Sequence, residues 1–417
     1  MYGTLALRPS SLDDHTAIAG EEAVAEIRRL AEPLRGLRVL HLSVTAFGTG
    51  VAELLNAAVP LTCDVGLDCA WQVVRPAEES AAANKALYRA LAGGDSGWSP
   101  ALADAWLRSS AANAEQLTES FDVVVVHDPQ PAAIRSFVTQ DARTNCRWVF
   151  HSHLDFSEAE PGAWALLREH LDGYDAIAFD AHSFVHPDLR TTPVTIIRPA
   201  IDPLGPRNMD LDAGAIEALL RRYSIDAERP LLLQMSPCDP GSDLLGAIDV
   251  ANLVRRETPG LQLALIAMNP PQDPASISYF GDAVRKSMDY PDVHILRGVS
   301  EVGNVEANAF QRASNVVIQK GLRRGFGIWI SDAQWKNRPV VTAKSGGLEQ
   351  QVIDGETGFF ANTTDDFAGR VSQLLNDREV AERLGRAGHK HVAENFLLTR
   401  FLADELRFLT QLTGAGQ

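Results

Sequence analysis

Apolar runs and amphipathic stretches alternate along most of the chain. Continuous apolar runs such as 37–44 and 121–126 predict strands that are buried on both faces, as in parallel sheets covered by helices. The stretch 50–66 has the apolar spacing of a helix, and similar stretches separate the later apolar runs. Because strands alternate with helices, the sequence predicts an α/β fold with parallel sheets and right-handed crossovers.

The alternation of predicted strands and helices is interrupted once, by the segment 199–211, which is rich in proline and asparagine. The alternation resumes after this segment. We therefore expect a first Rossmann-like domain at 1–204 and a second at 205–385. The remaining helices, at 386–417, are expected to pack back on the first domain. Open α/β sheets bind ligands beyond the carboxyl ends of their strands, so the site is expected where two such sheets face each other.

Charge and composition narrow the choice of partners. The 417 residues carry a formal charge of −16, which repels nucleic acid and leaves anionic small molecules only for a locally basic site. No apolar run reaches the length of about 18 residues that a membrane-spanning helix needs, and the N-terminus does not read as a secretion signal. The four cysteines form no CxxC motif, so we expect cytoplasmic thiols and no metal site.

The first glycine motif is "TAFGTGVAE", at 45–53, which follows a predicted strand and opens a predicted helix. At Gly48 and Gly50 backbone N–H groups could approach an anion, and the helix N-terminus would favour negative charge there. The alternative is a tight strand-to-helix turn that binds nothing.

Polar residues follow two buried runs directly, in "VVHDPQP" (125–131) and "FHSHLDFSE" (150–158). Since α/β proteins hold their chemistry at strand ends, we expect a pocket for hydroxyl groups there. Its candidate residues are Asp128, Gln130, His153 and Asp155. The alternative for the neighbouring histidines is a simple hydrogen bond at a strand end.

The second glycine motif is "GLRRGFGIWISDAQWK", at 321–336. Its "GFG" ends a turn and opens a helix, so the amides of that turn point toward any bound phosphate. Asp332, on the same helix, could accept hydrogen bonds from a ribose diol, or it could simply favour the helix dipole. The candidate phosphate-binding residues are Lys320, Arg323, Arg324, Gly325, Phe326 and Gly327.

Several motifs in order resemble retaining glycosyltransferases, and more narrowly the branch of trehalose synthase (glycosyltransferring) and trehalose phosphorylase. They include "FGTGVAELLNAAVPL", "VHDPQPAA", "SHLDFS", "PAIDPL", "QMSPCDPGSDLLGAIDV" and the segment from "GFG" to "DGETGFFA". The resemblance runs from about residue 38 to about 385. It implies the GT-B fold, in which two Rossmann-like domains face each other across a cleft.

The resemblance also implies roles for the candidate residues. His153 would lie nearest the reacting centre, where it would hydrogen-bond a sugar hydroxyl and stabilise an oxocarbenium-like state. A nucleotide sugar or sugar phosphate would be the donor, and no cofactor is expected. Sugar-type partners are expected, and a homodimer is left open. The acceptor side would comprise Glu53, Lys85, Asp128, Gln130 and Asp155.

This sequence departs from the family pattern around the donor. The family has two glutamates, separated by seven residues, where Arg324 and Asp332 stand, and an Arg and a Lys where Pro237 and Ser242 stand. An N-terminal His-Asn pair of the family is absent from "LYRALAG" at 87–93. Two interpretations follow. The chain is a transferase with altered donor recognition, or it is a pseudo-glycosyltransferase that binds a partner or performs atypical coupling chemistry.

Overall fold

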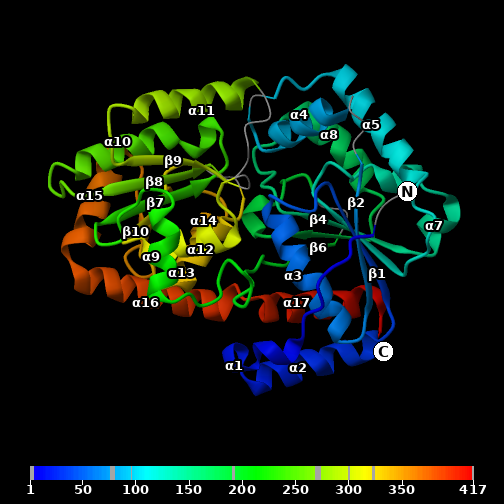
Figure 1. Cartoon of the computed structure of the whole chain (residues 1–417). Coiled ribbons are helices and arrows are strands. Elements are labelled where there is room, and N and C mark those ends of the chain that lie inside the picture. Colours follow the sequence, from blue (N-terminus) through cyan, green and yellow to red (C-terminus); the bar gives the residue numbers. More distant parts are fainter. Residues whose placement is uncertain are drawn as a thin grey trace. The chain divides into compact units, whose positions relative to one another are not determined.

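The computed structural model describes residues 4–75, 80–94, 96–189, 193–267, 274–298, 301–321 and 325–415. Their contacts divide the chain into two units (Figure 1). Unit 1 comprises residues 1–200, 324–326 and 398–417, and unit 2 comprises residues 201–323 and 327–397. Apart from the short segment 324–326, the unit changes after residues 200 and 397, whereas the sequence suggested boundaries after residues 204 and 385.

Unit 1 contains a parallel sheet with the strand order β2-β1-β3-β4-β5-β6 among its described residues. The strands are β1 (Arg38–Ser43), β2 (Asp68–Val73), β3 (Val123–His127), β4 (Arg147–Ser152), β5 (Ala176–Phe179) and β6 (Val194–Ile196). The helices are α1 (Thr16–Ala19), α2 (Glu21–Ala31), α3 (Gly50–Asp64), α4 (Ala81–Leu91), α5 (Pro100–Ala114), α6 (Ile134–Phe137), α7 (Gln140–Thr144), α8 (Pro161–Leu171) and α17 (Leu398–Thr413).

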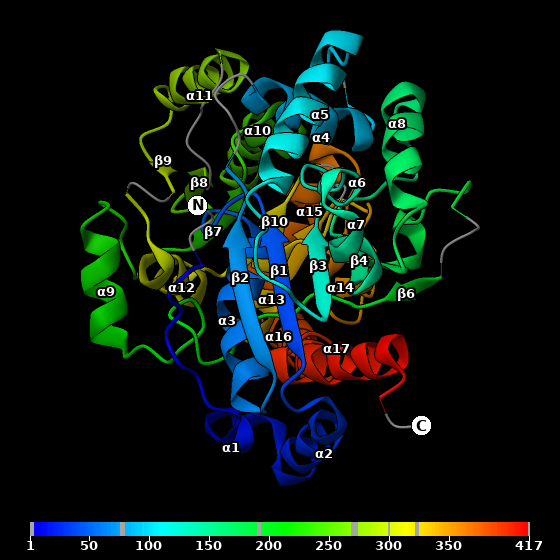
Figure 2. The same ribbon diagram turned by 90° about the vertical axis from the view of Figure 1, so that its right-hand side faces the viewer.

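Alternation along each strand of unit 1 sends side chains to two separate cores. Leu40 and Val124 pack with residues of α4, α5 and α8. Val39 and Val125 pack on the opposite face with α2, α3 and α17. Figure 2 shows α4 and α5 on one side of this sheet and α2, α3 and α17 on the other. His41 and His127, at odd positions of β1 and β3, therefore project to the face that α2, α3 and α17 cover.

Unit 2 contains a second parallel sheet, with the strand order β12-β11-β10-β7-β8-β9 among its described residues. The strands are β7 (Leu231–Ser236), β8 (Gln262–Ala267), β9 (Val293–Arg297), β10 (Val316–Gln319), β11 (Val340–Thr342) and β12 (Phe359–Phe360). The helices are α9 (Ala213–Arg221), α10 (Leu244–Val254), α11 (Pro274–Ser287), α12 (Asn304–Ala313), α13 (Ile328–Trp335), α14 (Leu348–Gln351), α15 (Thr364–Asn376) and α16 (Arg378–Asn395).

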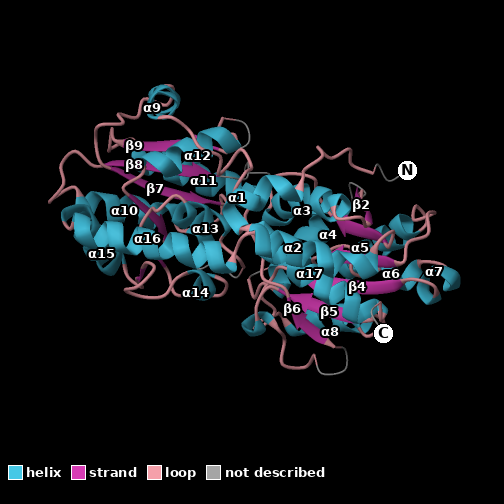
Figure 3. Cartoon of the chain, turned by 90° about the horizontal axis from the view of Figure 1, so that it is seen from below, coloured by secondary structure: helices cyan, strands magenta, loops and turns pink. Residues whose placement is uncertain are grey.

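The sheet of unit 2 is likewise covered by helices. Leu232, Leu263 and Val316 pack with α10, α11 and α15 on one face, and α12 and α13 contact the strands β7, β10 and β11. In Figure 3 the magenta strands of each unit lie among cyan helices, as the sequence pattern predicts. The expected α/β fold with parallel sheets is confirmed.

One strand of unit 1, β2, was not predicted from the sequence pattern. Strand β2 lies at the edge of its sheet and carries Asp68 and Gln72, so it lacks a continuous apolar run. Its outer edge is partly covered by the N-terminal segment, where Thr4 bridges Gln72 and the Leu5 N–H donates to the Trp71 carbonyl. Among the described residues, none of the helices is both long and apolar enough to cross a bilayer.

Candidate functional site

The loops after β3 and β4 lie side by side at the carboxyl edge of the sheet of unit 1. The two strands pair in register, with His127 opposite His151, so the residues that follow them are also neighbours. The backbone N–H of His153 donates to Asp128 Oδ1 at 3.0 Å. Asp128 has a φ of +65°, a left-handed conformation that aspartate tolerates better than most residues. The structure therefore brings together two of the residues selected from sequence.

Both ring nitrogens of His153 are engaged by protein groups. Its Nδ1 lies 3.0 Å from Oδ1 of Asp180, which follows β5 directly and is fully buried. Its Nε2 lies 3.1 Å from Nδ1 of His127. A sugar hydroxyl can therefore bind either nitrogen only if one of these two contacts opens.

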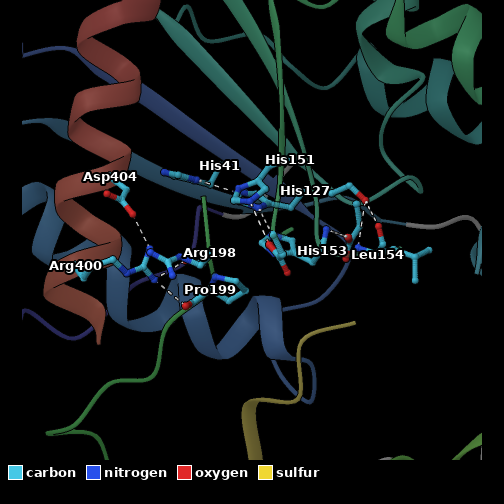
Figure 4. A network of polar contacts seen from close by, with 12 residues as sticks. His41, His127, His151, His153, Leu154, Arg198, Pro199, Arg400 and Asp404 are labelled. Carbon is cyan, nitrogen blue, oxygen red and sulfur yellow. Dashed lines mark hydrogen bonds and ion pairs between the residues drawn. The ribbon is translucent and has the colours of Figure 1, made fainter. Parts of the chain in front are cut away.

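The series of imidazoles continues away from His153 toward α17. His127 Nε2 lies 3.0 Å from His41 Nδ1, and His41 Nε2 lies 4.0 Å from Oε1 of Glu405 on α17. His41, His127 and His151 occupy odd positions of neighbouring strands, so all three project to the face that α17 covers. Figure 4 shows the imidazoles of these three residues and of His153 gathered in one place.

Electrostatics divides the cluster into charged and neutral members. Burial acts to raise the pKa of Asp180, but the neighbouring imidazoles and their hydrogen bonds outweigh it and lower the pKa, so Asp180 is an anion. Burial acts to lower the pKa of His153, but the carboxylate of Asp180 outweighs it, and the pKa is raised. Burial and the neighbouring imidazoles lower the pKa of His41 to about 3 and that of His151 to about 4. Burial and the neighbouring imidazoles also lower the pKa of His127 well below its ordinary value, so among these four histidines positive charge is favoured at His153 only.

The nitrogen atoms of His127, His151 and His153 lie within 4.8 Å of one another, which is close enough to consider a metal site. However, each nitrogen of His127 and of His153 already faces a protein group at 3.0 or 3.1 Å. The lone pairs therefore point along a hydrogen-bonded series and do not converge on one point. We do not assign these residues as metal ligands.

The other acceptor-side candidates lie on several elements of unit 1. Glu53 and Lys85 are half-buried on α3 and α4. Gln130 is partly buried, and its side-chain oxygen has no hydrogen-bond partner. Asp155 is buried and accepts a hydrogen bond from the backbone N–H of Ser157 at 2.9 Å. Their roles toward a sugar stay predictions.

The first glycine motif forms the predicted turn before α3. Gly48 has a φ of +77°, and Gly50 is the first residue of the helix. The side chain of Thr49 caps the helix by accepting a hydrogen bond from the N–H of Ala52 at 3.2 Å. Phe47 is 72% exposed at the tip of this loop. The cap uses one of the free N–H groups of the first turn, which leaves the others for water or a ligand.

The second glycine motif opens α13, as predicted. Gly327 is the N-cap residue and makes no side-chain cap. A Cβ atom there would lie 2.7 Å from Leu348 Cδ2, so the close packing of α13 requires glycine. Gly325 forms an isolated bridge with Leu154 of unit 1, and Phe326 is partly buried. Arg323 and Arg324 lie outside the described residues.

Lys320 is already paired in unit 2. Its ammonium group donates to Asp243 Oδ2, and only 11% of its side chain is exposed. The loop that carries Asp243 is fixed against the strand end, because a Cβ atom at Gly321 would lie 2.1 Å from the Gly241 carbonyl oxygen. Any phosphate bound by Lys320 must therefore compete with this carboxylate.

Asp332, on α13, is 1% exposed and belongs to a buried polar network. Its Oδ1 accepts from Asn208 Nδ2 at 2.8 Å, and its Oδ2 lies 3.5 Å from a guanidinium nitrogen of Arg207. Lys336, one turn later, donates to the Asp332 carbonyl at 3.0 Å and to Gln311 at 2.8 Å. Because Asp332 is almost completely buried, a ribose could reach its carboxylate only if the surrounding side chains move, so the ribose-binding role stays a prediction.

Sequence reasoning missed three members of the imidazole cluster. Asp180 directly follows a buried strand, so the rule that selected Asp128 could also have selected it. His41 lies inside a strand and Glu405 on a distant helix, and neither position carries a local signal. Only the pairing of β1 with β3 and the packing of α17 bring them together.

Comparison with known proteins agrees with this architecture. Residues 41–186 match the family model "Trehalose synthase, N-terminal domain", and residues 292–391 match "Glycosyl transferases group 1". The chain is 37% identical to a trehalose synthase of Rubrobacter xylanophilus, over 97% of both chains. It is 34% identical to a trehalose synthase of Pyrococcus horikoshii, again over 97% of both chains.

A solved structure shows the same fold at low sequence identity. An α,α-trehalose-phosphate synthase (UDP-forming) from Burkholderia xenovorans, in complex with glucose-6-phosphate, matches with a TM-score of 0.71 and 15% identity. The match covers 90% of this chain and 99% of that one. It supports the GT-B fold that the motifs implied.

Proposed function

The chain belongs to the trehalose synthase family of glycosyltransferases, and on that premise we propose that it forms a glycosidic bond to a sugar-type acceptor. The donor in this proposal is a sugar activated by a nucleotide or a phosphate, transferred with retention of configuration. The observation that carries the proposal is similarity along 97% of the length of a trehalose synthase.

Donor recognition is the part of the proposal that differs from the family pattern. Negative charge grows on the leaving phosphate, and each positioned cation or N–H donor lost from such a site typically costs about 10²–10³ in rate. The two cations of the family pattern are replaced by Pro237 and Ser242. We propose that Arg323 and Arg324 supply the charge instead, together with Lys320 when it leaves Asp243.

Unit 1 supplies the acceptor side in this proposal. His153 would turn one ring nitrogen to a sugar hydroxyl, and Asp128 would hold the loop by accepting the His153 N–H. No cofactor takes part, the partners are small sugars and activated sugars and not nucleic acid, and the protein acts in the cytoplasm. A homodimer is compatible with the proposal.

A donor panel tests the proposal directly. The protein is incubated with glucose and each of ADP-, UDP- and GDP-glucose or glucose 1-phosphate, and the product is identified by NMR, including its anomeric configuration. We expect an α,α-linked disaccharide with at least one donor. If no donor reacts, and calorimetry finds sugar binding without any affinity for a nucleotide or phosphate, the chain is a binding protein and the proposal fails.

The variant Arg324→Glu restores the family residue at the altered position. If Arg324 changes specificity, the variant should gain activity toward ordinary nucleotide-glucose donors and lose affinity for the natural one. Arg221→Glu, at an exposed helix residue of unit 2, is the charge-reversal control. Equal loss of activity in both variants would contradict a specific role for Arg324.

A further inference from the structure

Four buried side chains and the partly buried side chain of His153 lie in one series in unit 1. From α17 to the end of β5 the order is Glu405, His41, His127, His153 and Asp180. The distances are 3.0 Å between His41 and His127, 3.1 Å between His127 and His153, and 3.0 Å between His153 and Asp180. The distance between Glu405 and His41 is 4.0 Å, which exceeds hydrogen-bond distance. Neutral imidazole has one donor and one acceptor nitrogen, so each contact restricts the next.

Asp180 sets the direction of the whole series. An ionised carboxylate only accepts hydrogen bonds, so His153, when it is neutral, carries its proton on Nδ1 and presents Nε2 as an acceptor. His127 must then donate from Nδ1 to His153 and accept at Nε2. By the same argument His41 donates from Nδ1 to His127, and its free lone pair on Nε2 faces Glu405.

We propose that this series is a proton relay that joins the buried carboxyl group of Glu405 to His153. In the transfer, the Glu405 side chain first closes the 4.0 Å gap to His41 and gives its proton to His41 Nε2. His41 Nδ1–H then passes its proton to His127 Nε2, and His127 Nδ1–H passes its proton to His153 Nε2. Glu405 becomes a carboxylate, and His153 becomes an imidazolium beside the Asp180 carboxylate. One proton leaves one end and one arrives at the other, so the net charge of the series does not change.

The environment of each end favours these two states. Burial raises the pKa of Glu405 to about 7, although a hydrogen bond with Thr62 acts to lower it, so a protonated carboxyl is accessible near neutral pH. Asp180 stabilises the imidazolium at the other end. Other titratable or charged groups also act on the series.

Near His153 these are His151 and Asp128. Arg400 lies near Asp180, with Arg198 beside it, and Cys69 lies near Glu405. Figure 4 shows Arg400 on α17 directed toward Arg198 and Pro199.

The relay deepens the proposed function, on which its use in catalysis rests. An anionic group beside His153, such as the phosphate of an activated sugar, would draw the proton to His153 and leave the negative charge on distant Glu405. A neutral sugar alone would leave the proton on Glu405. The protein could thus create a cation next to a phosphoryl group without taking a proton from solvent, which suits a chain that has lost two family cations.

Nitrogen-15 NMR of the histidine-labelled, ligand-free protein tests the relay without any assay of activity. We expect His41, His127 and His153 each to carry the proton on Nδ1 when neutral, with signals assigned from single His→Gln variants. A proton on Nε2 of either His41 or His127 would overturn the relay. So would tight, stoichiometric Zn²⁺ binding to His127, because a metal would occupy a lone pair on which the relay depends.

Calorimetry with inorganic pyrophosphate as the probe, in buffers of different ionisation enthalpy, tests the transfer itself. The wild type should bind with little net proton uptake, whereas Glu405→Gln should take up close to one proton or bind more weakly. Glu26→Gln, at an exposed carboxyl of α2, should behave as the wild type. Equal proton uptake by all three proteins would overturn the transfer. If the probe does not bind at all, the phosphate part of the proposed function fails, and the NMR pattern alone decides the relay.

Discussion

Lys336 offers a sharp test of the buried network on α13. Its side chain is almost completely buried, 4% exposed, and its ammonium group donates to Asn208, Gln311 and the carbonyl of Asp332. Burial lowers its pKa from the ordinary value of 10.5 to about 7, although the carboxylate of Asp332 opposes the shift. The free energy of unfolding should therefore depend on pH through this one lysine.

The sign follows from the proton count in each state. Below pH 7 the folded and unfolded chains both carry the proton on Lys336, so this group adds no pH dependence there. Between pH 7 and 10.5 only the unfolded chain carries it, and stability then rises with pH. The slope approaches about 1.4 kcal/mol per pH unit. Between pH 7.5 and 9 the folded state should gain roughly 2 kcal/mol from this group.

Urea unfolding of the wild type and of Lys336→Met at pH 6, 7.5 and 9 measures this effect, because the variant cannot bind the proton in either state. The difference in the free energy of unfolding, wild type minus variant, should rise by less than about 1 kcal/mol between pH 6 and 7.5 and by roughly 2 kcal/mol between pH 7.5 and 9. Lys390→Met, at a side chain that is 77% exposed, is the matched control and should give a flat difference. A flat or falling difference for Lys336→Met would refute the reasoning.

Two further predictions concern backbone geometry. Gly385→Ala should lower the free energy of unfolding by about 1–2 kcal/mol, because a Cβ atom would lie 2.2 Å from the Asn337 carbonyl oxygen; chemical denaturation checks it. Gly369→Ala, in a helix with open space around the site, should raise it by about 0.5–1 kcal/mol, and equal effects would contradict the packing argument. Asp128→Ala should cost about 2–3 kcal/mol in thermal unfolding, because it loses the acceptor for His153 N–H at a φ of +65°. Asp128→Asn keeps both features and should cost much less, and similar losses in both variants would argue against this explanation.

Part of the candidate site could be read from local sequence because strand ends carry their own signal. Asp128 and His153 follow continuous apolar runs, and parallel register then places them in contact. The same reasoning placed glycines at the starts of α3 and α13, where the structure has them. Sequence reasoning could not show which charged side chains are free to bind a ligand, because that depends on the partners that each one meets in the folded protein.

Lys320 shows this limit clearly. Its sequence context offers a cation after a buried strand, but the fold pairs it with Asp243, 77 residues away. Asp332 likewise reads as a carboxylate near a phosphate turn, whereas the fold buries it against Asn208, 124 residues away. Long-range contacts of this kind leave no trace in local periodicity.

By itself, the sequence determined the alternating strands and helices, the parallel sheets and the family, because apolar periodicity and ordered motifs are local properties of the chain. Only the tertiary structure decided that His41, His127 and His153 stand in one series between two buried carboxyl groups. The physical reason is that a strand assigns each side chain to a face locally. The neighbour it meets there depends on strand order and on which helix covers that face, and both are set by the packing of the whole unit.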